Sequence, residues 1–124
     1  MTDRILIVDD NVRLCEILSE DLREEGYEVE TACDGRAGVQ AVARGGFDLI
    51  VLDIRMPTMD GLDALGKMLV RNRRTPIVLH TAYGTYRNDF RTWSADAYVT
   101  KSSDTTLLKE TIRRLIDEAA GDPA

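Results

Sequence analysis

Residues 5–10 read Ile-Leu-Ile-Val-Asp-Asp, and this stretch decides the fold that the sequence predicts. Its four apolar residues do not alternate with polar ones, so both faces of the strand that they form should be covered. Strands of this kind are typical of parallel sheets with helices on each side. Two aspartates follow directly. We therefore expect a buried parallel strand whose carboxyl end carries two acidic side chains.

Four further strand-like stretches lie downstream, at residues 29–32, 49–52, 77–79 and 97–100. The segments between successive strands can hold a helix and two turns and are too long for hairpins. Three of these helices are predicted by apolar residues at helical spacing: Leu14, Ile17, Leu18 and Leu22; Leu62, Leu65 and Leu69; Leu108, Ile112, Leu115 and Ile116. Gly26 is a natural stop for the first, and Ser103 or Asp104 could cap the last.

Two helices are less clearly marked. The second, at residues 36–43, carries only small apolar residues, and the fourth, within residues 85–94, shows just Phe90 and Trp93 among polar neighbours. Because it has so few apolar anchors, the fourth helix should be among the least stable elements, which makes it a candidate switch element. Simple core packing of Phe90 and Trp93 is the competing interpretation of the fourth helix.

Five strands that alternate with five helices predict a doubly wound α/β domain. Right-handed crossovers allow the flavodoxin-like (βα)5 arrangement, in which a five-stranded parallel sheet has the strand order 2-1-3-4-5. We expect residues 1–120 to form this single domain. Residues 121–124 should be a C-terminal tail or the start of a linker.

The composition restricts the partners and the location of the protein. The net charge is -6 and the pI is about 4.7, which argues against nucleic acid or an anionic membrane surface as a partner. No apolar run exceeds four residues, whereas a membrane-spanning helix needs about 18. No secretory signal is apparent either, so we expect a soluble, cytoplasmic domain. Cys15 and Cys33 are expected to be buried free thiols.

The strand ends hold the residues that can carry chemistry. Ligands of an open parallel sheet bind beyond the carboxyl ends of its strands, and these ends carry Asp9, Asp10, Asp53, Thr81 and Lys101. Two like charges about 5 Å apart repel by roughly 3 kcal/mol at an effective dielectric constant near 20. A bound cation would therefore stabilise three ionised carboxylates at this position. Oxygen ligands of this kind favour Mg²⁺.

An aspartate beside such an ion can accept a phosphoryl group as a mixed anhydride. Asp9 and Asp10 are adjacent and could serve one ion, whereas Asp53 stands alone at a central strand end and is the candidate nucleophile. Lys101 could neutralise the phosphoryl oxygens, and Thr81 could hydrogen-bond one of them. Alone, each of these residues is more often a cap, a turn or a surface residue. The combination is what supports the prediction.

With these residues in view, the chain resembles the receiver domain of two-component response regulators, from Arg4 to about Ala119. The resemblance rests on five motifs: Ile5-Leu6-Ile7-Val8-Asp9-Asp10-Asn11, Leu52-Asp53-Ile54-Arg55-Met56-Pro57, Met59-Asp60-Gly61, Thr81-Ala82 and Tyr98-Val99-Thr100-Lys101. It implies that Asp53 accepts a phosphoryl group from the phosphohistidine of a histidine kinase or phosphotransfer protein.

The resemblance also assigns the supporting residues. Asp9, Asp10 and Asp53, with the backbone carbonyl of Arg55, would bind Mg²⁺. Thr81 and Lys101 match the switch hydroxyl and the phosphate-binding lysine, and Tyr98 matches the aromatic residue whose rotamer reports phosphorylation.

Such a domain is not an enzyme beyond self-catalysed phosphoryl acceptance and slow autodephosphorylation. It would signal to a protein partner through its fourth helix, fifth strand and fifth helix. One departure from the family concerns the residue after Lys101, which is usually a proline joined by a cis peptide bond and is Ser102 here. Because a non-proline cis bond costs about 2.5–4 kcal/mol, we expect the Lys101–Ser102 bond to be trans.

Three other functions remain open on the sequence. A flavodoxin-like FMN carrier would need a phosphate cradle after the first strand, where Asp9-Asp10-Asn11 would repel the phosphate. A small phosphatase would use Asp9 as nucleophile but would need a cap segment over its substrate. A receiver-like domain that no longer takes phosphate would not need an intact Asp53. His80, the one histidine, is expected to be a hydrogen-bonded or packed core residue, because strand alternation points it away from the side of Thr81.

Overall fold

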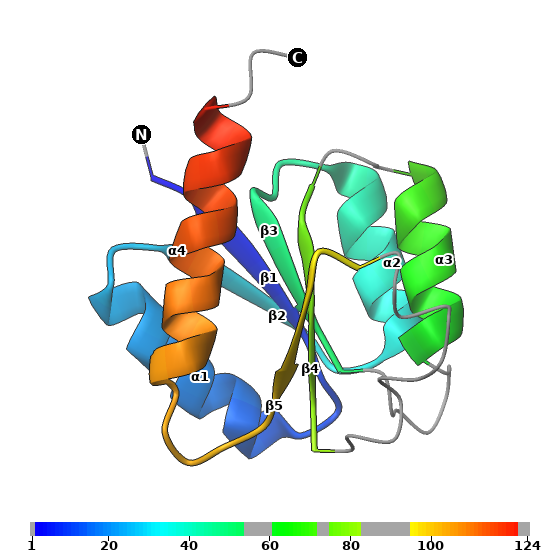
Figure 1. Cartoon of the computed structure of the whole chain (residues 1–124). Helices are drawn as coiled ribbons and strands as arrows, with labels where there is room; N and C mark the ends of the chain where they lie inside the picture. The colour runs from blue at the N-terminus through cyan, green and yellow to red at the C-terminus, as the bar shows by residue number, and fades with distance from the viewer. Residues whose placement is uncertain (1, 54–60, 72–74, 83–94, 122–124) are drawn as a thin grey trace.

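We analysed a computed structural model of the chain, which describes residues 2–53, 61–71, 75–82 and 95–121. Its elements follow one another in the order β1 (Arg4–Val8), α1 (Val12–Glu24), β2 (Glu28–Ala32), α2 (Gly35–Arg44), β3 (Leu49–Leu52), α3 (Gly61–Arg71), β4 (Ile77–Thr81), β5 (Ala97–Thr100) and α4 (Thr106–Gly121). Figure 1 shows them along the chain. The predicted helix within residues 85–94 lies outside the described residues, so α4 is the helix that the sequence predicts as the fifth.

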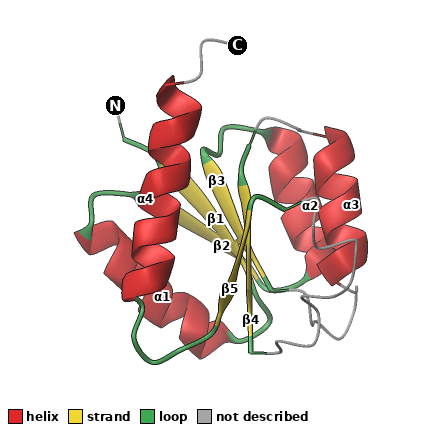
Figure 2. Ribbon diagram, in the orientation of Figure 1, coloured by secondary structure: helices red, strands yellow, loops and turns green. Residues whose placement is uncertain are grey.

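The strands form one five-stranded sheet in the order β2-β1-β3-β4-β5, with every pair parallel. Figure 2 shows that α1 and α4 cover one face of this sheet and that α2 and α3 cover the other. The predicted doubly wound architecture and strand order are thus confirmed. Val8, the last residue of β1, pairs with Ala32 on one side and Leu52 on the other, so these three strands end at the same level.

Each face of the sheet buries its own apolar core. Under α2 and α3 the core includes Leu6, Val8 and Met68, and under α1 and α4 it includes Ile5 and Ile112. Successive residues of β1 thus enter opposite cores, which is the alternation that a strand imposes. All residues of β3 and β4 are buried, as the unbroken apolar runs predict.

Capping residues define the helix ends. The side chains of Asn11 and Asp34 accept hydrogen bonds from backbone N–H groups in the first turns of α1 and α2. Gly26, just after α1, has a φ of 97°, a conformation that suits glycine. Before α4, Asp104 Oδ1 accepts from the Thr106 N–H at 2.9 Å in a local turn, and the carbonyl of Thr105 accepts the first hydrogen bond of the helix, from the Lys109 N–H at 3.0 Å. Thr105, one residue after the two predicted caps, therefore holds the N-cap position.

The expectation that both cysteines are buried is wrong for Cys33. Cys15 is buried, but Cys33 is exposed, because it follows the last residue of the edge strand β2. Ile17 is 49% exposed, since α1 turns the face with Cys15, Leu18 and Leu22 toward the sheet. Within the described residues every peptide bond is trans, Lys101–Ser102 included, as expected. None of the helices in this part of the chain is both long and apolar enough to span a membrane.

Candidate functional site

The pairing of β1 with its neighbours places two acidic residues at one edge of the sheet. Asp9 continues from β1 and donates its N–H to the carbonyl of Ala32 at 3.0 Å. Asp53 continues from β3 and donates its N–H to the carbonyl of Val8 at 2.9 Å. These bonds extend the sheet by one residue at each strand, and so they hold the two aspartates at the same depth.

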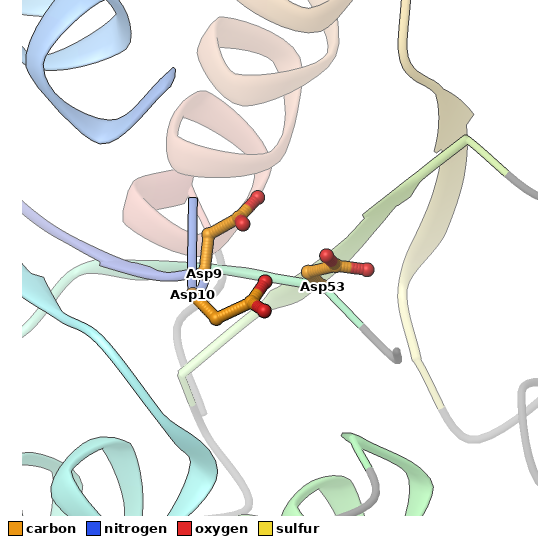
Figure 3. A group of neighbouring side chains, drawn as sticks. All are labelled: Asp9, Asp10 and Asp53. Carbon is orange, nitrogen blue, oxygen red and sulfur yellow. The ribbon is translucent and has the colours of Figure 1, made fainter. Parts of the chain in front are cut away.

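Three carboxylates gather at this edge. One oxygen from each of Asp9, Asp10 and Asp53 lies within 4.8 Å of the others, as Figure 3 shows. Asp9 and Asp53 are buried, whereas Asp10 is exposed. At this separation two carboxylate charges repel by roughly 3 kcal/mol at an effective dielectric constant near 20. The cluster predicted from the sequence is therefore real, and it needs positive charge close by.

Lys101 supplies part of that charge. Its Nζ lies 2.8 Å from Asp9 Oδ2 and 3.1 Å from Asp53 Oδ2. The backbone holds it there, because the Lys101 N–H donates to the carbonyl of Thr81 at 2.7 Å. Burial disfavours the charged ammonium, but hydrogen bonds and attraction to Asp9 and Asp53 outweigh burial and raise the pKa of Lys101. Lys101 is thus a fixed cation in this site.

Asp9 makes two further contacts besides those with β2 and Lys101. The Asn11 N–H donates to Asp9 Oδ1 at 2.9 Å, and the Cys15 thiol donates to the Asp9 carbonyl at 3.4 Å. Together with Lys101, these contacts fix the side chain and the backbone of Asp9. Neither contact was predicted from the sequence. The Asn11 contact follows an i, i+2 pattern typical of aspartate, whereas the Cys15 contact depends on how α1 packs on β1.

The carboxylates fit a hard divalent cation. They provide closely spaced oxygen atoms from three residues, the donor set that Mg²⁺ binds alongside water. The exposed side chain of Asp10 leaves the cluster open to solvent on one side. Arg55, expected to add its backbone carbonyl, lies outside the described residues.

The two expected switch residues lie on the neighbouring strands. Thr81 is the fully buried last residue of β4, and its carbonyl holds Lys101 in place. Tyr98 lies in β5 opposite Leu79 and packs, half-buried, against the core under α2 and α3. Thr81 is therefore joined to the acidic cluster through Lys101. Tyr98 lies further back along the sheet, three residues before Lys101.

His80 is a buried core residue, as expected, with 4% of its surface exposed. Its neighbour in the register is Val99, which belongs to the core under α1 and α4. Burial, reinforced by the nearby positive charge of Lys101, lowers the pKa of His80 to about 4. At neutral pH its imidazole is therefore uncharged.

Comparison with known proteins identifies the family. The model of the response regulator receiver domain matches residues 5–113. The chain therefore belongs to the response regulator receiver domain family, as its motifs predict.

Two similar proteins are transcriptional regulators. TcrA of Mycobacterium tuberculosis is 36% identical over 114 residues, which are 90% of this chain and 45% of TcrA. PcoR of Escherichia coli is 32% identical over 123 residues, 98% of this chain and 54% of PcoR. The chain thus spans about half the length of these relatives.

Solved structures agree in fold. The response regulator TrrA of Thermotoga maritima, in complex with Mg²⁺-BeF, is 42% identical and superposes with a TM-score of 0.89 over 92% of this chain and 99% of TrrA. A CheY-like receiver domain from Methanospirillum hungatei is 31% identical, with a TM-score of 0.92 over 97% and 98% of the two chains. TrrA has also been solved in complex with the histidine kinase ThkA, where it superposes with a TM-score of 0.86 over 92% of this chain and 98% of TrrA.

Proposed function

We propose that this receiver domain accepts a phosphoryl group on Asp53 from a phosphohistidine and passes the signal to a protein partner. The observation that carries the proposal is the bridge that Lys101 makes between Asp9 and Asp53 beside the exposed Asp10. In a member of the receiver family, this arrangement provides an acidic acceptor, a fixed cation and a cluster fit for a divalent metal.

We assign a ligand role to Asp9 and the acceptor role to Asp53. Both carboxylate oxygens of Asp9 have partners, with Oδ1 taken by the Asn11 N–H and Oδ2 by Lys101. Asp9 is thereby fixed as a ligand and a source of negative charge. Asp53 ends a central strand on the same edge of the sheet. This distinction also argues against the phosphatase alternative, in which Asp9 would be the nucleophile.

The transfer needs one bond to form and one to break. A carboxylate oxygen of Asp53 forms a bond to phosphorus while the bond from phosphorus to the donor imidazole nitrogen breaks, and that nitrogen keeps the electron pair. Lys101 would stabilise negative charge on the phosphoryl oxygens, and the Thr81 hydroxyl would donate a hydrogen bond to one of them. No external oxidant or reductant is required.

Mg²⁺ is the cofactor that this site fits. Asp9, Asp10 and Asp53, with the backbone carbonyl of Arg55, would hold it, and when bound it would neutralise phosphoryl charge as phosphoryl-transfer sites require. Support comes from the 4.8 Å cluster of carboxylate oxygens and from the Mg²⁺-BeF complex of TrrA. Lys101, in contact with Asp9 and Asp53, would then help to orient the phosphoryl group.

The proposed partners follow from the same roles. A histidine kinase or phosphotransfer protein would donate the phosphoryl group, which the TrrA–ThkA complex supports. The response would reach a protein partner through Thr81, Tyr98, β5 and α4, together with the predicted fourth helix, whose residues 85–94 lie outside the described part of the chain. The net charge of -6 favours neither nucleic acid nor an anionic membrane as partner. We place the domain at residues 1–120, in the cytoplasm, with no catalysis beyond its own phosphorylation and slow dephosphorylation.

Intact-mass analysis tests the acceptor. After incubation with acetyl phosphate and Mg²⁺, the wild-type chain should gain the mass of one phosphoryl group, and Asp53→Asn should gain none. Asp117→Asn, an exposed aspartate on α4, is the matched control and should behave as wild type. An undiminished gain in Asp53→Asn would place the phosphoryl group elsewhere. Failure of the wild type to gain mass would favour a receiver that no longer takes phosphate.

A second experiment tests the donor. A histidine kinase carrying radiolabelled phosphohistidine is mixed with the wild type, Asp53→Asn or Asp117→Asn. Label should move to the wild type and to the Asp117 variant and stay on the kinase with Asp53→Asn. Labelling by acetyl phosphate but by no kinase tested would contradict the proposed donor class for those kinases while leaving Asp53 as acceptor.

A further inference from the structure

A short loop, residues 102–105, leads from Lys101 into α4. It reads Ser-Ser-Asp-Thr and has no proline, so no ring fixes any of its backbone dihedral angles. Inside the loop, Ser102 Oγ accepts from the Asp104 N–H at 3.2 Å, a bond between two residues of the loop itself. Contacts at the two ends of the loop therefore set its path.

The first of these contacts is made by the backbone of Lys101. This residue follows β5 and donates its N–H to the carbonyl of Thr81 at 2.7 Å. From there its ammonium group reaches two carboxylates at once, 2.8 Å from Asp9 and 3.1 Å from Asp53. A long side chain loses considerable conformational entropy when it is held in this way. The position of the ammonium group therefore depends on a backbone that keeps one orientation.

Asp21 of α1 makes the second contact. Its Oδ2 accepts from the Thr105 hydroxyl at 2.7 Å, and its Oδ1 lies 3.1 Å from Lys109 Nζ, one turn further along α4. The hydrogen bond from Thr105 is the main reason why the pKa of Asp21 lies below its usual value; burial opposes this effect, and Lys109 adds to it. The carboxylate is therefore ionised at neutral pH and ties the start of α4 to α1.

This tie differs from the other polar contacts of the loop. Asp104 Oδ1 accepts from the N–H and the hydroxyl of Thr106, which are local contacts at the start of α4. Within the described part of the chain, the Thr105–Asp21 bond is thus the one side-chain hydrogen bond that joins the loop to an element other than α4. Leu22, next to Asp21, is buried in the core under α1 and α4, so α1 is a firm base for this bond.

We propose that Thr105 and Asp21 are positioning residues for Lys101. Their hydrogen bond sets the path of the loop and so keeps the Lys101 ammonium group between Asp9 and Asp53. Neither residue touches the reacting atoms, and without their bond Lys101 would occupy this position for a smaller fraction of the time. The inference rests on the proposed function, since Lys101 would act on a phosphoryl group only if Asp53 accepts one.

NMR relaxation tests the positioning without any phosphoryl transfer. The lysines of the chain are Lys67, Lys101 and Lys109, so the methylene signals next to their ammonium groups can be assigned. Thr105→Val removes the hydroxyl and keeps the shape of the side chain. In this variant the order parameter of the Lys101 methylene should fall to that of Lys67, which is exposed on α3. Thr105→Ser, which keeps the hydroxyl, should restore the wild-type value.

Thr106→Val is the matched control, because the hydroxyl of this neighbouring threonine makes only the local contact with Asp104. It should leave the order parameter of Lys101 unchanged. Asp21→Ala removes the acceptor and should loosen Lys101 as Thr105→Val does, whereas Asp21→Asn keeps an oxygen that can accept from Thr105 and should stay close to the wild type. Unchanged order of Lys101 in folded Thr105→Val and Asp21→Ala variants would overturn the inference, and so would an equal loss in Thr106→Val.

The rate of phosphorylation by acetyl phosphate and Mg²⁺ tests whether Thr105 acts through Lys101. Thr105→Val should slow this rate about three- to tenfold, the range expected for one lost hydrogen bond. In a Lys101→Met background the same substitution should cause no further slowing, because the residue that Thr105 positions is absent. Equal slowing in both backgrounds would show that Thr105 only supports the fold, and the inference would be wrong.

Phosphorylation of the wild type separates this role from the proposed function. If the wild type gains no phosphoryl group, the proposed function is contradicted, and the order parameter of Lys101 alone decides whether Thr105 holds it. If the wild type gains the group and Thr105→Val gains it equally fast, only the positioning role is contradicted.

Discussion

The ammonium group of Lys101 lies 3.1 Å from the carboxylate of Asp53, a residue 48 positions earlier in the chain. The same nitrogen lies 2.8 Å from Asp9, so one cation bridges two buried acids. Their carboxylates would otherwise repel each other with little water to screen them. Lys101 therefore stabilises the fold of the site before it takes any part in chemistry.

Removing this cation should destabilise the protein. In Lys101→Met, the free energy of unfolding without metal should fall by roughly 1–3 kcal/mol, because two buried carboxylates lose their counter-charge. Mg²⁺ should recover part of the loss. Urea denaturation with and without Mg²⁺ measures both effects.

Lys109→Met is the matched control, since Lys109 also bridges two acids, Asp21 and Glu25, but at the surface. It should destabilise the protein much less, and Mg²⁺ should not correct its effect. Equal losses in the two variants would mean that the Lys101 bridge has no special electrostatic role.

The exposed carboxylate of Asp10 should matter for metal binding more than for folding. Asp10→Asn should weaken Mg²⁺ binding at least tenfold, because it removes a charged ligand, a loss of about 1.4 kcal/mol or more. Without Mg²⁺ its stability should equal or exceed that of the wild type, because repulsion within the cluster is reduced. Calorimetric Mg²⁺ titration and thermal unfolding measure the two quantities. Asp117→Asn should change neither, and wild-type affinity in Asp10→Asn would remove Asp10 from the ligand set.

Acid should destabilise the fold through His80. Its pKa is lowered to about 4 in the folded chain, first by burial and then by Lys101, with Asp9 opposing the shift. Below pH 6.5 the unfolded chain binds a proton at this residue that the folded chain does not, so the stability falls as the pH falls toward 4. The contribution of His80 should be about 2 kcal/mol between pH 7.5 and 5.

The comparison of wild type with His80→Leu isolates that contribution. The difference between their free energies of unfolding should change by this amount between pH 7.5 and 5, with the variant less sensitive to acid. NMR titration should place the pKa of the imidazole near 4. A measured value near 6.5 would contradict the prediction.

The two thiols should differ in reactivity. Burial, followed by the charge of Asp9, raises the pKa of Cys15 to about 11, whereas Cys33 is exposed. Because the thiolate is the reactive form, a thiol reagent should label Cys33 quickly in the native protein and Cys15 only after denaturation. Mass spectrometry of labelled peptides measures this, with Cys33→Ser as the control. Fast native labelling of Cys15 would show that α1 does not protect it.

Much of the fold could be predicted from local patterns. The unbroken apolar run of β1 indicates a strand covered on both faces, and the spacing of Leu108, Ile112, Leu115 and Ile116 indicates the inner face of α4, all of whose members are buried. Such patterns are informative because a strand repeats every two residues and a helix every 3.6. The pattern does not predict the burial of Ile17, which is exposed. A broad apolar stripe on a helix does not specify which of its residues contact the sheet.

The sequence alone determined the class of the fold and the set of acidic, hydroxyl and basic residues at its strand ends, because these depend on local backbone geometry and on order along the chain. The tertiary structure decided how those residues meet. In the folded chain Asp9 is buried, whereas its neighbour Asp10 is exposed. Lys101 lies between Asp9 and Asp53. Cys33 is exposed next to an edge strand, and His80, with its buried Nδ1, lines a small cavity. These outcomes depend on packing between segments far apart in the chain, which no local periodicity encodes.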